Sequence, residues 1–248
     1  MTFRTFLVAA FALLALGSVP AQASNDKTPP GDPCAKDNGN PCNGNNGNEG
    51  DQGNANKERM TYSEPGSIDV PLPAVSGRAA YVTQIGTAHE ATIIQSAPNA
   101  YARVTQEGER HEASVTQAGG GTSYAKLDQA GEANLAVATQ DGVGQNVLYL
   151  SQDGARNLAT STQMASGAVY NGAILAQQGD DNRLSLTQDG ADNRAVLLQN
   201  GDRNTMTAVQ DGDANRLIWT QHGDNLSNLG ITQTGGGAMM VTQTGIGK

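Results

Sequence analysis

The residues of this chain that could do chemistry are mostly carboxamides, and they recur at a fixed interval. Glutamine stands at Gln188, Gln199, Gln210 and Gln221, so each follows the previous one by eleven residues. A carboxamide donates and accepts hydrogen bonds, but it does not act as a nucleophile or transfer protons at neutral pH. The chemistry open to such a series is therefore hydrogen bonding among its own members.

Sequence patterns of catalytic and metal sites do not accompany these amides. The serines fall in strand or turn positions with no histidine in register, and no Lys-Ser/Thr pair of a phosphate-binding loop follows the glycine-containing turns. The Asp-Gly turns resemble those of calcium-binding repeats, but such repeats have a period of about nine residues and denser aspartate. We expect no enzyme activity, no cofactor and no metal site.

Two of the three histidines are 22 residues apart, and His89 and His111 both stand where most repeats carry asparagine. One interpretation is a pH-sensitive or metal-binding pair, because two protonated rings stacked together would repel each other. The other is that each ring replaces the asparagine amide as a hydrogen-bonding group. The lack of a carboxylate to complete a site favours this second interpretation.

The segments that carry the amides repeat from about Ser76 to the C-terminus. Fifteen glutamines mark the repeats, most of them eleven residues apart, and thirteen of them have glycine two residues later. An eleven-residue period also suits a helix, but a glycine in every period costs roughly 1 kcal/mol relative to alanine, so such a helix would not persist. The period is better explained by one strand and one turn.

Alternation within each repeat assigns its two faces. In the segment from Asn193 to Gln199, Asn193, Ala195 and Leu197 share one face with Gln199, and Arg194 points to the other. Charge belongs in water, so we expect the amide face inside and the face of Arg183, Arg194 and Arg216 outside. The Asp-Gly turns need positive φ, which glycine adopts freely.

These patterns predict an all-β chain that folds as a β-solenoid, with two strands in each coil of about 22 residues and about seven and a half coils. Stacked coils would hold each glutamine about 4.8 Å from its counterpart, so that the buried side-chain amides bond to one another in a ladder, and the asparagines likewise. The predicted ladder residues are Gln129, Asn134, Gln140, Asn146, Gln152, Asn157, Gln163, Asn171, Gln177, Asn182, Gln188, Asn193, Gln199, Asn204, Gln210, Asn215 and Gln221. The predicted turn glycines are Gly131, Gly142, Gly154, Gly179, Gly190, Gly201 and Gly212.

Two segments precede the predicted solenoid of residues 76–248. Residues 1–23 have the apolar run and the Ala21-Gln22-Ala23 cleavage pattern of a signal peptide, so we expect export. Residues 24–75 are rich in Gly, Asn and Pro and are expected to be disordered. In an oxidising compartment Cys34 and Cys42 could form a disulfide; the alternative is two unpaired thiols.

Charge and hydropathy exclude two further classes of function. The formal net charge of −9 leaves no basic patch for phosphates, so we expect no nucleic acid partner. After the signal peptide no run approaches the about 18–20 apolar residues of a membrane helix, so no transmembrane segment is expected.

The repeats follow the pattern Gln-x-Gly-x-x-Asn-x-Ala-x-x-x-Gln in residues 129–140, 152–163 and 188–199. This pattern resembles the curlin repeat of bacterial curli fibres, and the resemblance extends over about residues 76–248. It implies a β-solenoid subunit, major or nucleating, of an extracellular functional amyloid that serves adhesion and biofilm. The implied partners are further copies of the chain, a companion curlin subunit, a curli-type outer-membrane secretion pore, and host or abiotic surfaces.

The ends of the repeat array depart from this pattern. In the asparagine position the substitutes are His89, Ala100, His111, Ser123, Ser227 and Gly237. A solenoid leaves unpaired strand edges at both terminal coils, and the C-terminal TQTGIGK does not resemble a capping helix, so we expect end-to-end association. Stacked acidic residues in the turns should slow this association and keep the chain soluble.

A second function is open to the same fold. Alternate strands would place Thr116, Thr139, Thr162 and Thr187 in one outward column, with Ser114, Thr160, Ser185 and Thr207 beside it. A flat array of this kind could bind ice or carbohydrate. The alternative is ordinary β-propensity on a solvated face, and Val137 and Val209 interrupt the array.

Overall fold

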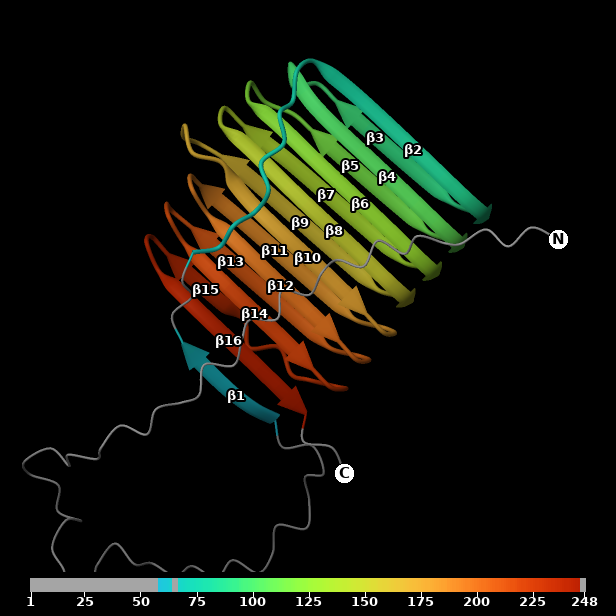
Figure 1. Cartoon of the computed structure of the whole chain (residues 1–248), viewed down its shortest axis with the longest axis vertical. Coiled ribbons are helices and arrows are strands. Elements are labelled where there is room, and N and C mark those ends of the chain that lie inside the picture. The colour runs from blue at the N-terminus through green and yellow to red at the C-terminus, as the bar shows by residue number, and fades with distance from the viewer. Residues whose placement is uncertain (1–57, 64–66, 246–248) are drawn as a thin grey trace, which may run out of the picture. The chain divides into compact units, whose positions relative to one another are not determined.

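The computed structural model describes residues 58–63 and 67–245, and every regular element in these ranges is a β-strand (Figure 1). Strands β2 to β16 are the fifteen strands of the repeat, and successive strands alternate between two sheets. The predicted β-solenoid of two-strand coils is therefore confirmed. The described residues contain no helix long and apolar enough to cross a membrane.

Sheet A contains the even-numbered strands and, at one edge, β1. Its members are β1 (Glu58–Ser63), β2 (Arg78–Thr87), β4 (Asn99–Glu109), β6 (Thr122–Glu132), β8 (Gln145–Ala155), β10 (Asn171–Gln178), β12 (Arg194–Asn200), β14 (Arg216–His222) and β16 (Ala238–Gly245). Sheet B contains the other odd-numbered strands. Its members are β3 (Glu90–Gln95), β5 (Glu112–Gln117), β7 (Leu135–Gly142), β9 (Leu158–Ala165), β11 (Arg183–Gly190), β13 (Thr205–Asp211) and β15 (Ile231–Thr234).

Neighbouring repeat strands pair in parallel, and the glutamines set the register. Gln188 is the partner of Gln210 in sheet B, and Gln199 is the partner of Gln221 in sheet A. A parallel neighbour must come from the next coil, because the chain has to return to the same end of the sheet before it can pair. The fixed repeat length thus places each residue type above itself.

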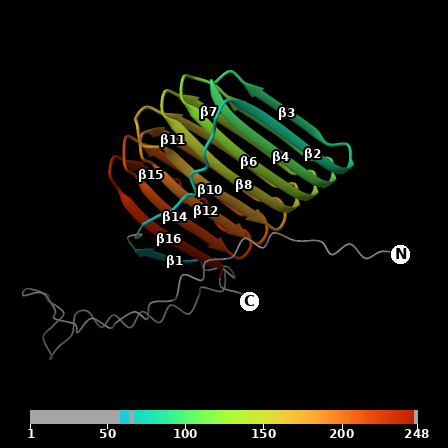
Figure 2. The ribbon, with the colours of Figure 1, turned by 45° about the horizontal axis from the view of Figure 1, so that its top comes forward.

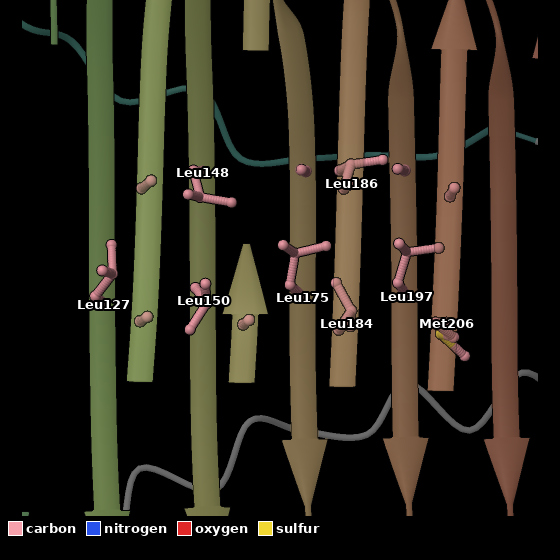
Figure 3. Packing of buried hydrophobic residues seen from close by; sticks show 14 of the residues in the cluster. Leu127, Leu148, Leu150, Leu175, Leu184, Leu186, Leu197 and Met206 are labelled. Atoms are coloured by element: carbon pink, nitrogen blue, oxygen red, sulfur yellow. The ribbon is translucent and has the colours of Figure 1, made fainter. Parts of the chain in front are cut away.

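The core is a narrow apolar layer between the two sheets, and most strands contribute two side chains to it (Figure 3). Alternating burial along β13 and β14 places Met206, Ala208, Leu217 and Trp219 inside, between the inward amides. The small side chains allow the two sheets to approach closely, and the large ones fill the remaining space. The inward orientation of the amide face is thereby confirmed.

One arginine departs from the expectation that all three lie in water. Arg183 is exposed, but only 7% of the surface of Arg194 is accessible. Its guanidinium lies 3.6 Å from the ring centroid of Tyr170 and pairs with Asp192 at 3.1 Å. Tyr170 belongs to the long fourteen-residue interval before Gln177, and this insertion supplies the aromatic face that covers the arginine.

Ordered chain begins before the predicted boundary at Ser76. β1 pairs antiparallel with β16, and residues 67–77, here named the strap, cross the outer face of sheet A to the start of β2 (Figure 1 and Figure 2). Disorder throughout residues 24–75 is therefore wrong for 58–63 and 67–75. The signal peptide at 1–23, the remainder of 24–75, and both Cys34 and Cys42 lie outside the described residues.

Candidate functional site, two buried amide ladders

The glutamines form two continuous amide ladders, one on the inner face of each sheet. In every rung the side-chain Nε2 donates to the Oε1 of the glutamine in the next coil, at 2.7–2.9 Å. The sheet A ladder is Gln84, Gln106, Gln129, Gln152, Gln177, Gln199, Gln221 and Gln243. The sheet B ladder is Gln95, Gln117, Gln140, Gln163, Gln188, Gln210 and Gln233.

From Gln95 onwards, each ladder amide also joins one sheet to the other. The Nε2 of Gln210 donates to the backbone carbonyl of Arg194 at 3.0 Å, and Gln221 donates likewise to Thr205 at 3.0 Å. The accepting residue lies sixteen positions earlier, on the strand across the core. Both side-chain donor hydrogens are thus used, which is what makes a fully buried amide tolerable.

The ladders have a direction. Donors point from each coil towards the coil that follows it in the sequence, so the N-terminal rungs present the Oε1 acceptors of Gln84 and Gln95. Gln233 and Gln243 are the last rungs in the described part of the chain, where their Nε2 groups donate to the carbonyls of Arg216 and Ser227. The two ends of the stack are therefore chemically different.

The asparagines do not form the side-chain ladder that was predicted for them. The Oδ1 of Asn157 accepts the backbone N–H of Asn182 at 3.0 Å, and its Nδ2 donates to the carbonyl of Gly179 at 2.7 Å. Among the predicted ladder asparagines, all of which lie in the described part of the chain, only Asn215 and Asn193 bond to each other side chain to side chain, at 3.0 Å. Asparagine is one methylene shorter than glutamine and stands where a strand begins, so its amide reaches the backbone of the next turn instead.

One predicted asparagine is imperfectly satisfied. The Nδ2 of Asn146 donates to the carbonyl of Asp141 at 2.7 Å, but its buried Oδ1 makes no hydrogen bond. The next asparagine of the same column is Asn171, which lies within the long fourteen-residue interval between Gln163 and Gln177. The interruption of the column therefore coincides with the insertion that carries Tyr170.

The seven predicted turn glycines all have positive φ, as expected. All of them except Gly212 are also crowded by the next coil; for example, a Cβ added to Gly201 would overlap the carbonyl oxygen of Gly223. Just before the asparagine position, nine residues other than glycine also adopt positive φ, including Ala133 and Ala214. This second left-handed residue of each turn was not expected from the sequence, where its identity varies.

The two histidines take over the hydrogen bonds of asparagine, as the second interpretation predicted. Their rings stack at 5.2 Å with an interplanar angle of 2°. The Nδ1 of His111 accepts the backbone N–H of Asn134 at 3.2 Å, and its Nε2 bonds the carbonyl of Glu107 at 3.0 Å. Burial is the main cause that lowers the pKa of His111, with the nearby charge of His89 acting in the same direction.

At the C-terminal end one assignment changes. Leu226, not Ser227, occupies the asparagine position after Gln221, because the backbone N–H of Leu226 donates to the Oδ1 of Asn204 at 2.9 Å. Leu226 is buried and Ser227 is exposed. The extra residue of this twelve-residue repeat lies after the asparagine position, so Leu226 keeps the usual five-residue distance from Gln221, and the prediction of Ser227 is wrong.

No protein-family model, curated protein or solved structure matches this chain. The site must therefore be interpreted from its own geometry. Among the described residues no group of three or more side chains is placed to hold a metal ion. What the site does contain is a directional series of amides, each hydrogen-bonded to the glutamine of the next coil.

Proposed function

We propose that this protein is a structural subunit of an extracellular, curli-like amyloid fibre in which solenoids stack head to tail. The polarity of the amide ladders carries the proposal. A stack begins with the acceptors of Gln84 and Gln95 and ends with the rungs of Gln233 and Gln243. Head-to-tail addition is the arrangement that sets the last rungs of one copy against the first acceptors of the next.

The first coil supports the proposal because its inward-facing apolar side chains are partly exposed to solvent. Val82 is 47% exposed, although Val104, its partner in the next coil, is completely buried. The outer edges of β2 and β3 likewise have no neighbouring strand in the described part of the chain. Exposed apolar side chains beside unpaired strand edges favour the addition of another strand.

The resemblance to curlin repeats supplies the biological setting of the proposal. Export by the signal peptide and a curli-type outer-membrane pore would deliver the chain to the cell surface. There it would polymerise with itself and a companion curlin subunit, serving adhesion to host or abiotic surfaces and the biofilm matrix. The role of the ladders in this setting is structural, and it requires no catalysis.

The proposal can be tested with a charge placed at the junction between subunits. We expect mature chain, residues 24–248, to form fibres visible by electron microscopy, and Val82→Lys to prevent them by burying an unpaired ammonium. Val143→Lys is the matched control, because Val143 is 75% exposed in a turn in the middle of the stack. Equal fibre yields from the two variants would reject head-to-tail stacking.

A second candidate function rests on the outward face of sheet B. Thr116, Thr139, Thr162 and Thr187 lie in register on successive strands, as predicted. Such a column could order water or bind a polysaccharide. Thermal hysteresis, or retention on insoluble polysaccharide, by protein that forms no fibres would favour this function over the first.

A further inference from the structure

We propose that β15 and β16 form the docking surface for the first coil of a second copy, through the strand edges that face away from β13 and β14. We further propose that β1 covers the β16 part of this surface in the free subunit. The inference rests on the proposed fibre function. It specifies which strands pair at the junction, the rotation of the incoming copy about the stack axis, and the strand, β1, that must first dissociate from β16.

The number of strands fixes the orientation of the incoming copy. Without β1, sheet A has eight repeat strands and sheet B has seven, so the stack ends on a half coil. A second copy added without rotation would leave one strand position vacant in sheet B. A copy turned by half a turn about the stack axis instead sets its β3 on β16 and its β2 on β15, and both sheets continue.

The half-turned arrangement also matches side chains. It would align Gln95 of the incoming copy with Gln243, and Gln84 with Gln233, so both ladders continue. Two positions before these glutamines, Ile93 would meet Val241, and Val82 would meet Ile231. Val241 and Ile231 belong to the apolar core, so the junction would extend the core as well as the ladders.

β1 occupies the edge that this docking requires. β14 pairs with one edge of β16, and β1 pairs with the other, from Glu58 opposite Gly245 to Ser63 opposite Met240. A strand has two edges, so β3 of a second copy cannot pair with β16 while β1 is in place. β1 runs antiparallel to β16, with Met60 opposite Gln243 in the register, whereas the repeat strands pair in parallel.

The strap is long enough to deliver β1 from the far end of the same molecule. Seven strand spacings separate β2 from β16 in sheet A, which is about 34 Å at about 4.8 Å each. The fourteen residues 64–77 connect β1 to β2, and extended chain of this length reaches about 46 Å. The cap at the last coil is thus joined directly to the first coil.

The strap has its own anchor on the outer face of sheet A. Val70 is completely buried, and its backbone carbonyl accepts a hydrogen bond from the Tyr170 hydroxyl at 2.7 Å. The Tyr149 hydroxyl donates to the carbonyl of Pro71 at 3.3 Å. With the strap held there, β1 can leave β16 and return without a search, because a short tether gives an effective concentration of about 1 mM.

β1 and the β3 strand of a second copy compete for the same edge of β16, and the anchored strap decides which of them binds first. Subunits at micromolar concentration meet a tethered competitor of higher local concentration, so capping should delay the first contacts between copies. A second copy pairs with both β15 and β16 and extends both ladders, whereas β1 offers six residue pairs to one sheet. Once fibre ends exist, the second copy should therefore displace β1.

A reversible cross-link between β1 and β16 tests the proposal. Thr61 and Thr242 are partners in the pairing, so Thr61→Cys with Thr242→Cys should form a disulfide, in a chain that also carries Cys34→Ser and Cys42→Ser. We expect the oxidised chain to form fibres at least tenfold more slowly than the reduced chain, and reductant to restore the rate. The matched control, Thr220→Cys with Thr242→Cys, links β14 to β16 without holding β1, and should assemble equally in both redox states.

A substitution in the strap, at the buried Val70, tests the capping role without a cross-link. Val70→Asp should release the strap and shorten the lag before assembly. Leu72→Asp, at a position that is 50% exposed, should leave the lag unchanged. Equal lags for these two variants would contradict the capping role.

The orientation is tested by cross-links inside preformed fibres, in the same cysteine-free background. The half-turned junction would place Thr242 beside Ile94 of the next copy, whereas an unrotated junction would place it beside Thr83. We expect Thr242→Cys to form intermolecular disulfides with Ile94→Cys and not with Thr83→Cys. If the Thr61→Cys, Thr242→Cys chain forms fibres at the same rate when oxidised and when reduced, the capping proposal is overturned, and the fibre function is not. If neither the parent chain nor any variant forms fibres, the fibre function itself is rejected.

Discussion

The side-chain amide of Gln188 donates a hydrogen bond to that of Gln210 at 2.8 Å, and both side chains are completely buried. Neither could be buried without the other, because an unpaired amide in an apolar interior is costly. Each coil therefore stabilises the next, and the same hydrogen bond recurs at every rung, between buried amides from Gln106 in one ladder and Gln117 in the other. Under the proposed fibre function, the same dependence would favour the addition of further coils at the ends of the stack.

Removing one ladder glutamine should destabilise the subunit far more than removing the adjacent glutamine on the outer face of the same strand. Gln177 bonds to Gln152, Gln199 and the carbonyl of Leu158. We expect Gln177→Ala to lower the free energy of unfolding by roughly 2–4 kcal/mol, because it leaves buried partners unpaired. Gln178→Ala, on the exposed side of the same strand, should change it by less than about 0.5 kcal/mol. Denaturant titration measures both, and similar losses would contradict the structural role of the ladder.

The two left-handed positions of the turns should respond to substitution with opposite signs. Gly201→Ala should destabilise by at least about 3 kcal/mol, since the new Cβ would overlap the carbonyl of Gly223 and force the turn open. Ala133 has a φ of 54°, so Ala133→Gly should relieve strain and stabilise by up to about 1 kcal/mol. Destabilisation of equal size in both variants would contradict this account of the turns.

Stability should decrease in mild acid because of His111. Burial holds its pKa below the ordinary value of 6.5, so the unfolded chain takes up a proton first as the pH falls. The stabilisation is complete above pH 6.5 and decreases as the pH falls from there through the lower pKa of the folded state. His111→Asn should flatten the dependence of unfolding free energy on pH below about 6.5. His222→Asn, at an exposed position, is the control, and an unchanged slope in His111→Asn would exclude this role.

Much of the fold could be predicted from the sequence because the repeat restricts it so tightly. Glycine two residues after glutamine excludes a long helix, and alternation from Asn193 to Gln199 then fixes both strand and face. A polar residue on the inner face, recurring every coil, can be satisfied by its own copies. The inward glutamines, the turn glycines and the histidine replacement all follow from this argument, and the structure bears them out.

The features that the repeat does not encode were missed. β1 and the strap lie in a segment without hydrophobic periodicity, and an antiparallel strand far from its partner leaves no local signal. The burial of Arg194 depends on Tyr170, which an insertion places beside it. The backbone bonds of the asparagines depend on turn geometry, which residue type and spacing alone do not specify.

Fibre diffraction from residues 24–248, the chain without the predicted signal peptide, tests the central claim most directly. If subunits stack head to tail through their terminal coils, aligned fibres should give a meridional reflection at about 4.8 Å, the spacing between strands along the stack. A chain that remains monomeric at high concentration, with no fibres and no such reflection, would contradict the account.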